Sequence, residues 1–252
     1  MTDENRVALV TGGGRGIGRA ICRALAGDGI SVAINYRRDE RAAQSVCAEL
    51  ETLGVRAHCY QAVISDQPAV DVLAEQVLAD FGRVDVVVNN AGVASRGHSV
   101  ADTESAEFTR LLDTNVLGPI RLLRKLLPAL REHPRSDVIF ISSTNALVTP
   151  ANGGAYNIAK AAMEALAQTL AKEERQQGIR VNTVAPGLVR TDMGERLARG
   201  AMGVSHIDEL NVRLPFGRVC EPEDVAAAVR WLVSAEASYL TGEVLKIWGG
   251  GQ

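Results

Sequence analysis

Tyr156 and Lys160 are of residue types and at a spacing that suit proton exchange with a substrate. They lie four residues apart in an Ala-rich segment, so a helix would place them on one face. A tyrosine with an ordinary pKa of about 10 exchanges protons poorly at neutral pH, but a nearby cation favours its phenolate. Lys160 would supply that cation. The alternative, from spacing alone, is a core tyrosine beside a surface lysine.

Two further polar residues accompany this pair. Ser143 ends the predicted strand 137–143, and ligands of open α/β sheets bind beyond the carboxyl ends of strands. Its hydroxyl would therefore hold a substrate oxygen. Asn115 interrupts the apolar stretch 111–127. A hydrogen bond between helices explains Asn115 as well as a role in chemistry does.

A glycine-rich turn, TGGGRGIG at residues 11–18, follows the first predicted strand and opens the first predicted helix. Gly12, Gly16 and Gly18 let the backbone turn sharply and approach a pyrophosphate, and the amides of the helix N-terminus attract that anion. Because a strand precedes the turn and a helix follows it, the turn predicts a dinucleotide site.

The residues after the second predicted strand favour NADP over NAD. Folds that bind NAD place an acid there for the ribose 2′-hydroxyl, whereas a base meets the 2′-phosphate of NADP. This chain reads Asn35-Tyr36-Arg37-Arg38, and Arg15 of the glycine turn can converge on the same phosphate. Solvated arginines are the alternative.

Short β-branched runs alternate with amphipathic stretches along the whole chain. Helices are expected at about 16–28, 39–53, 67–82, 103–132, 154–177 and 222–234, and strands at 6–11, 31–36, 55–62, 84–89, 137–143, 180–184 and 243–247. Strands that are apolar on both sides require helices on both faces of a sheet. The pattern predicts an α/β, Rossmann-like, doubly wound fold with a seven-stranded parallel sheet. Residues 1–252 are expected to form a single domain, with an irregular substrate-binding loop at about 187–218.

Composition and charge argue against several other classes of protein. The formal charge of −3 comes from 30 acids and 27 bases that alternate along the helical segments, so no nucleic-acid partner is expected. No signal peptide is recognisable, and no apolar run approaches the ~20 residues that span a bilayer, which indicates a cytoplasmic protein without a membrane partner. The four cysteines show no metal-ligand spacing with the histidines, so no metal is expected, and isolated thiols are predicted.

The chain resembles the short-chain dehydrogenase/reductase family from end to end. The matching motifs are TGGGRGIG at 11–18, NNAG at 89–92, Asn115, Ser143, YNIAK at 156–160, PG at 186–187 with Thr191, and LTGEVL at 240–245. The resemblance implies that Tyr156 is general acid in carbonyl reduction and that Lys160 binds the nicotinamide ribose and lowers the Tyr156 pKa. It also implies that Ser143 polarises the carbonyl and that Asn115 holds a water in a proton relay.

The same resemblance implies two sets of binding residues. The cofactor is expected to contact Gly12, Arg15, Gly16, Ile17, Gly18, Arg37, Ile64, Asn90, Ala91, Gly92, Tyr156, Lys160, Pro186, Gly187, Val189 and Thr191. The substrate pocket is expected to be lined by Ala94, Ser95, Ser143, Asn145, Leu147, Leu188 and Met193. Two positions depart from the family pattern, because Val63 and Trp248 stand where many members have Asp.

Within the family, the chain looks most like 3-oxoacyl-carrier-protein reductases and related ketoreductases. The expected activity is NADPH-dependent reduction of a 3-oxoacyl thioester or related small ketone, with an acyl carrier protein as a candidate partner near Arg131, Arg135, Lys172 and Arg175. The alternatives are a dehydrogenase that oxidises a sugar or secondary alcohol and a non-catalytic dinucleotide sensor. The resemblance also implies a homotetramer that pairs the predicted helices 103–132 and 154–177.

Overall fold

The computed structural model, which describes residues 6–214 and 216–251, contains a seven-stranded sheet in which every strand pair is parallel. The strand order is β3-β2-β1-β4-β5-β6-β7. The strands are β1 (Val7–Thr11), β2 (Ser31–Tyr36), β3 (Ala57–Gln61), β4 (Val86–Asn89), β5 (Ser136–Ile141), β6 (Ile179–Pro186) and β7 (Val244–Ile247). The predicted doubly wound parallel sheet is confirmed.

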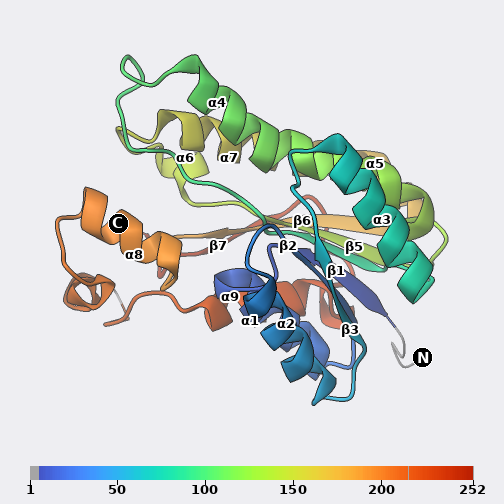
Figure 1. Ribbon diagram of the computed structural model, residues 1–252. Coiled ribbons are helices and arrows are strands. Elements are labelled where there is room, and N and C mark those ends of the chain that lie inside the picture. Colours follow the sequence, from blue (N-terminus) through green and yellow to red (C-terminus); the bar gives the residue numbers. More distant parts are fainter. Residues whose placement is uncertain (1–5, 215, 252) are drawn as a thin grey trace.

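Helices cover both faces of this sheet, with α1, α2 and α9 on one side and α3, α4, α5 and α7 on the other (Figure 1). The helices are α1 (Gly16–Gly27), α2 (Glu40–Glu51), α3 (Gln67–Phe81), α4 (Ser105–Leu112), α5 (Gly118–Leu130), α6 (Asn145–Val148), α7 (Gly154–Glu174), α8 (Asp192–Ala201) and α9 (Pro222–Leu232). No helix in the described ranges is both long and apolar enough to cross a bilayer.

The sheet forms the centre of two apolar cores, one on each face. Alternate side chains of one strand point to opposite faces. Val86 and Val88 of β4 therefore belong to the core under α1 and α9, and Val87 belongs to the core under α3, α5 and α7. A strand buried on both faces must be apolar at nearly every position, which is why these segments read as continuous Val, Ile and Leu runs.

The structure divides the predicted helix 103–132 and orders the predicted loop 187–218. A π-helix, Asp113–Leu117, separates α4 from α5. The segment after β6 folds into α8 and a 3₁₀ helix, Ile207–Arg213, around a small core that includes Ala198, Ile207 and Leu210. We name residues 187–218 the lid segment.

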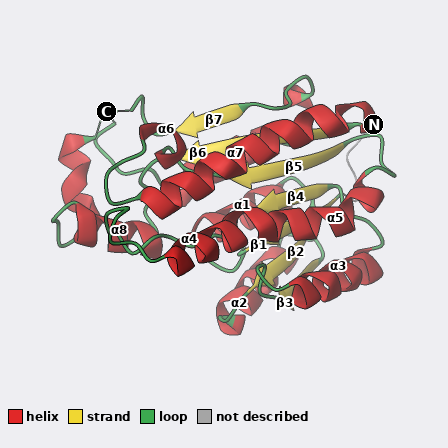
Figure 2. Cartoon of the chain, turned by 90° about the horizontal axis from the view of Figure 1, so that it is seen from above, coloured by secondary structure: helices red, strands yellow, loops and turns green. Residues whose placement is uncertain are grey.

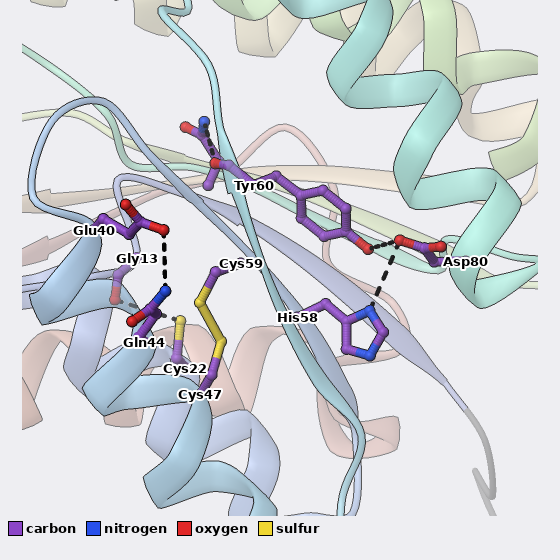
Figure 3. The surroundings of a disulfide bond; sticks show 10 residues. Gly13, Cys22, Glu40, Gln44, Cys47, His58, Cys59, Tyr60 and Asp80 are labelled. Atoms are coloured by element: carbon purple, nitrogen blue, oxygen red, sulfur yellow. Dashed lines mark hydrogen bonds and ion pairs between the residues drawn. A yellow bond between two sulfur atoms is a disulfide. The ribbon is translucent and has the colours of Figure 1, made fainter.

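The expectation of isolated thiols is wrong for two of the four cysteines. A disulfide joins Cys47 of α2 to Cys59 of β3, whereas Cys22 and Cys220 are free (Figure 3). The pair forms because α2 packs on β3, a contact that sequence spacing does not reveal. Tyr60, the next residue of this edge strand, donates a hydrogen bond to Asp80 of α3 at 2.7 Å. Side chains of β3 thus fasten it to a helix on each face.

We predict that the Cys47→Ser, Cys59→Ser double substitution lowers the free energy of unfolding by about 2–3 kcal/mol, because a short loop is no longer closed in the unfolded chain. Urea denaturation with and without dithiothreitol measures this. Wild type should lose stability in the reductant, and the double variant should not respond to it. Alkylation of four thiols in the unreduced, denatured protein would contradict the pairing.

Candidate active site

The glycine turn after β1 brings α1 against the carboxyl end of the sheet. Gly12 and Gly16 have positive φ angles of 64° and 51°, which L side chains rarely adopt. A Cβ atom on Gly18 would lie 2.3 Å from the Gly12 carbonyl oxygen. Arg15 precedes α1 and provides no side-chain cap for its first turn, so the amides there remain suited to an anion.

The ends of β1 and β4 are joined beside this turn. The Thr11 hydroxyl accepts hydrogen bonds from the backbone amides of Asn90 and Ala91, both at 3.0 Å. The Asn90 side-chain amide donates to the carbonyl oxygens of Thr11 at 2.8 Å and Gly12 at 3.2 Å. These four bonds fix the segment that leads to Gly92 next to the glycine turn.

Free positive charge lies at the end of β2. Arg37 and Arg38 are exposed and form no hydrogen bond or ion pair through their side chains to other described residues. Arg15 lies 3.6 Å from Asp192, but both side chains are largely exposed and such a pair is weak. In the next loop Val63 is exposed and Ile64 is buried. Arg37 and Arg38 at this strand end are of the residue type that suits the 2′-phosphate of NADP.

Tyr156 and Lys160 lie on one face of α7, as their spacing predicts. The Lys160 ammonium is buried, donates to the Ile141 carbonyl oxygen at 2.8 Å and lies 5.6 Å from the centre of the Tyr156 ring. Ser143, buried directly after β5, forms a hydrogen bond that lowers the Tyr156 pKa. The three side chains thus meet beyond the carboxyl end of β5.

Burial dominates the proton affinities of this group. It raises the pKa of Tyr156 to about 12, against the hydrogen bond to Ser143. It lowers the pKa of Lys160 to about 8, against the negative charge of Glu164. Lys160 was expected to lower the Tyr156 pKa, but the lowering effect in this structure comes from Ser143, and the cost of burying the phenolate exceeds it. At neutral pH the phenol therefore carries its proton, the form that a general acid needs.

Asn115 lies in the π-helix, a distortion that often occurs at functional sites. Its side-chain amide donates to the carbonyl oxygens of Leu111 at 2.9 Å and Val93 at 3.3 Å, so it does not join two helices. Its Oδ1 atom is buried and has no partner among the described residues. A Cβ atom on Gly92 would lie 2.8 Å from this oxygen and 3.8 Å from the Lys160 Nζ atom. Gly92 therefore leaves room between Asn115 and Lys160.

The predicted substrate residues come from three segments around this centre. Ala94 and Ser95 follow β4, Asn145 and Leu147 lie on α6, and Leu188 and Met193 lie on the lid segment. Leu147 and Met193 are exposed, but Leu188 packs against the small core of the lid segment. Two further apolar residues are exposed nearby: Val148 beside Leu147, which sequence reasoning missed, and Leu197 one turn after Met193, which lies in the predicted substrate-binding loop but was not singled out. In the sequence, Val148 is marked only by its position next to Leu147, and Leu197 only by its i, i+4 spacing from Met193.

Pro186 ends β6, and Gly187 and Val189 begin the lid segment. The Gly187 amide donates to the Ile247 carbonyl oxygen at 3.0 Å. A Cβ atom on Gly187 would lie 3.1 Å from the Cβ of Trp248. Trp248, which replaces an expected Asp, therefore packs directly against this connection.

The basic residues suggested for a carrier protein lie at the edge of the sheet where the strands begin, opposite the edge that holds Tyr156. Arg131 follows α5 and forms an ion pair with Glu174, and Arg135 precedes β5 and forms one with Asp137 at 3.6 Å. Figure 2 shows that the strands point from this edge toward α6 and α8. Within one chain, the expectation that these arginines adjoin the site entrance is wrong. The parallel sheet places the end of α5 and the start of β5 opposite Tyr156.

Comparisons with known proteins agree with this geometry. A family model described as Enoyl-(Acyl carrier protein) reductase matches residues 12–252. The 3-oxoacyl-[acyl-carrier-protein] reductase FabG of Escherichia coli is 34% identical over 252 residues, which cover 99% of this chain and 98% of the relative. Two solved structures are also similar over nearly their whole length. A short-chain dehydrogenase from Burkholderia cenocepacia in complex with NADP has a TM-score of 0.89, 35% identity and coverage of 99% of this chain and 98% of that one. An NAD⁺-bound xylitol dehydrogenase has a TM-score of 0.90, 28% identity and coverage of 99% and 100%.

A doubly wound sheet with a glycine turn and a Ser, Tyr and Lys cluster defines a dinucleotide-dependent oxidoreductase. The chain belongs to the short-chain dehydrogenase/reductase family. Among residues 6–214 and 216–251, no group of three or more His, Cys, Asp or Glu is placed to hold a metal ion.

We predict that Gly18→Ala weakens dinucleotide binding more than tenfold and destabilises the fold by about 1–3 kcal/mol, because its methyl group collides with the Gly12 carbonyl. Gly27→Ala on the same helix is the matched control, since a Cβ there meets nothing within 4 Å. Fluorescence titration with NADPH and urea denaturation measure the two effects. Equal behaviour of the two variants would contradict the close approach.

Proposed function

We propose that this protein reduces a ketone to a secondary alcohol with NADPH, and that the ketone is a 3-oxoacyl thioester or a related compound. The observation that carries the proposal is the cluster of Tyr156, Ser143 and Lys160 beyond the carboxyl end of β5. The glycine turn and the loop after β4 adjoin this place and fit a dinucleotide. The complete set with Asn115 argues against a sensor without turnover, which needs no proton donor.

NADPH supplies the hydride. In the protein, the Ser143 hydroxyl polarises the substrate carbonyl and Tyr156 donates its phenolic proton to the carbonyl oxygen as the alcohol forms. The positive charge of Lys160 stabilises the resulting phenolate. The buried Oδ1 of Asn115, directed to the space beside Gly92 and Lys160, suits a water that returns a proton to this pair. In the oxidising direction the same groups work in reverse.

An apolar rim favours an acyl chain over a sugar. Leu147 and Val148 of α6 and Met193 and Leu197 of α8 expose aliphatic side chains. Such side chains gain by contact with apolar substrate and offer no hydrogen bonds to sugar hydroxyls. The similarity to the E. coli 3-oxoacyl reductase supports the same assignment, whereas the similar xylitol dehydrogenase keeps oxidation of a polyol as the second candidate.

A spectrophotometric assay at 340 nm tests the proposal with NADPH and NADH side by side. The substrates are an acetoacetyl thioester, a panel of small ketones and, in the reverse direction, a sugar alcohol. Preferential oxidation of NADPH with the thioester supports the proposal. Turnover of the sugar alcohol alone would transfer the assignment to the second candidate.

We predict that Tyr156→Phe lowers kcat for reduction by about 10²–10⁴-fold, because the general acid is lost. The dissociation constant of NADPH should change by less than about threefold, since the ring remains. Single-turnover kinetics and fluorescence titration check the two values. Full activity in Tyr156→Phe would contradict the mechanism.

We predict that Arg37→Ala weakens NADPH binding by about 10–100-fold and leaves NADH binding unchanged, because a charge-assisted bond to the 2′-phosphate is lost. Arg124→Ala, which removes an exposed arginine of α5, is the control. Isothermal titration with each cofactor gives the comparison. A parallel loss for both cofactors would show that Arg37 does not distinguish them.

We also propose that the protein is a homotetramer that pairs α4–α5 and α7 across a two-fold axis. Leu117 of the π-helix and Ile158 of α7 are exposed apolar side chains on these elements. The small residues Ala161 and Ala165 of α7 are exposed as well and allow a helix to approach closely. Light scattering after gel filtration decides between a tetramer and a monomer.

A further inference from the structure

Lys160 carries its charge in an almost fully buried position, with 4% of the residue exposed. Its Nζ atom donates to the Ile141 carbonyl oxygen at 2.8 Å and lies 3.8 Å from the Met163 sulfur. An ammonium group has three donors and loses hydration on burial, so a neutral carbonyl and a thioether compensate it poorly. The charged form therefore needs a nearby anion.

Glu164 supplies that anion. It follows Lys160 by one helical turn on α7, and its half-buried carboxylate accepts a hydrogen bond from the Ser142 hydroxyl at 2.8 Å. The Ser142 hydroxyl also lies 3.5 Å from the Lys160 carbonyl oxygen. Two consecutive residues at the end of β5, Ile141 and Ser142, thus hold the two opposite charges of α7.

The charged groups around Glu164 come from two elements. Burial raises the pKa of Glu164, against the hydrogen bond from Ser142 and the positive charges of Lys160 on α7 and Lys246 on β7, which lower it. Lys246 also lies 5.7 Å from the centre of the Trp248 ring. The charge of Glu164 in turn raises the pKa of Lys160 against the effect of burial.

We propose that Glu164 is a positioning residue that keeps Lys160 charged at the pH at which the enzyme works. The inference rests on the proposed function, because it assigns the ammonium form of Lys160 to catalysis. Without the carboxylate, burial alone acts on the lysine and its pKa falls further below the ordinary value. Since only the charged form assists Tyr156, the activity would then be lost at lower pH than in wild type.

Glu164→Gln tests this directly, because the amide oxygen still accepts from Ser142 while the charge is gone. The chain has four lysines, Lys125, Lys160, Lys172 and Lys246, so ¹³C-labelled lysine can be assigned and titrated by NMR in the protein without cofactor. The Lys160 midpoint should move to lower pH by about one pH unit. The alkaline limb of kcat for ketone reduction should move with it, giving about a fivefold loss at pH 8 and little loss at pH 6.

Two variants serve as controls for the charge. Glu164→Asp should restore most of the wild-type midpoint, because it keeps the carboxylate. Glu173→Gln removes an exposed carboxylate of the same helix and should leave both readouts unchanged. If Glu164→Gln does not fold, Glu164→Met tests the same interaction, since it also removes the carboxylate and should lower the Lys160 midpoint.

An unchanged Lys160 midpoint in Glu164→Gln, or in Glu164→Met where that variant replaces it, would overturn the proposal. A loss of kcat that is equal at every pH with an unchanged midpoint would do so as well, and would make Glu164 purely structural. If no ketone is reduced by any variant, the proposed function fails, but the NMR titration still decides whether Glu164 sets the charge of Lys160.

Discussion

All described strands run parallel, and the position of every part of the candidate active site depends on this constraint. Parallel strands end at one edge of the sheet, so every loop that leaves a strand toward the next helix emerges on the same side. The order of strands reverses at β1, whose neighbours are β2 and β4, and the chain leaves these strands toward helices on opposite faces. The glycine turn, the segment after β4 and Ser143 after β5 therefore meet, although they are far apart in sequence.

Burial then sets the chemistry of the groups that meet. A phenol and an ammonium in an apolar environment both shift toward their neutral forms. Tyr156 thus keeps a proton to donate, and Lys160 sits near the limit at which it remains charged. The carbonyl oxygen of Ile141 and the carboxylate of Glu164 lie on the side that favours the charge. The site combines a proton donor with a cation for two reasons. Burial keeps the proton on Tyr156, and the carbonyl oxygen of Ile141 and the carboxylate of Glu164 offset part of the cost of burying the Lys160 charge.

The sequence predicted those parts of the fold and of the candidate site that depend on local pattern. The glycine turn was recognisable because a strand, the glycines and a helix are contiguous, and Tyr156 and Lys160 because helical spacing is short. The Cys47–Cys59 pair was not predictable, because it depends on how α2 packs on β3. Nor was the π-helix at Asn115, since one extra residue in a helical turn leaves no mark on apolar periodicity.

The residues whose positions were predicted wrongly share one physical reason. Separation along the sequence does not tell on which side of the sheet a residue lies or where its side chain points. Arg131 and Arg135 are close to Ser143 along the chain, yet a whole strand separates them from it. Leu188 follows Pro186 and Gly187 of the predicted cofactor set, but its half-buried side chain packs on the small core of the lid segment. Such reversals depend on which face an element packs against, and only tertiary structure fixes that.

The lid segment is coupled to the glycine turn through Thr191. Its hydroxyl accepts a hydrogen bond from the Gly194 amide at 3.1 Å and so caps the N-terminus of α8. Its methyl carbon would lie 3.2 Å from a Cβ on Gly16, the first residue of α1. The first turns of two helices therefore lie beside each other, and that of α8 carries the carboxylates of Asp192 and Glu195. A displacement of α1 would thereby also displace α8, the helix that bears the exposed side chains of Met193 and Leu197.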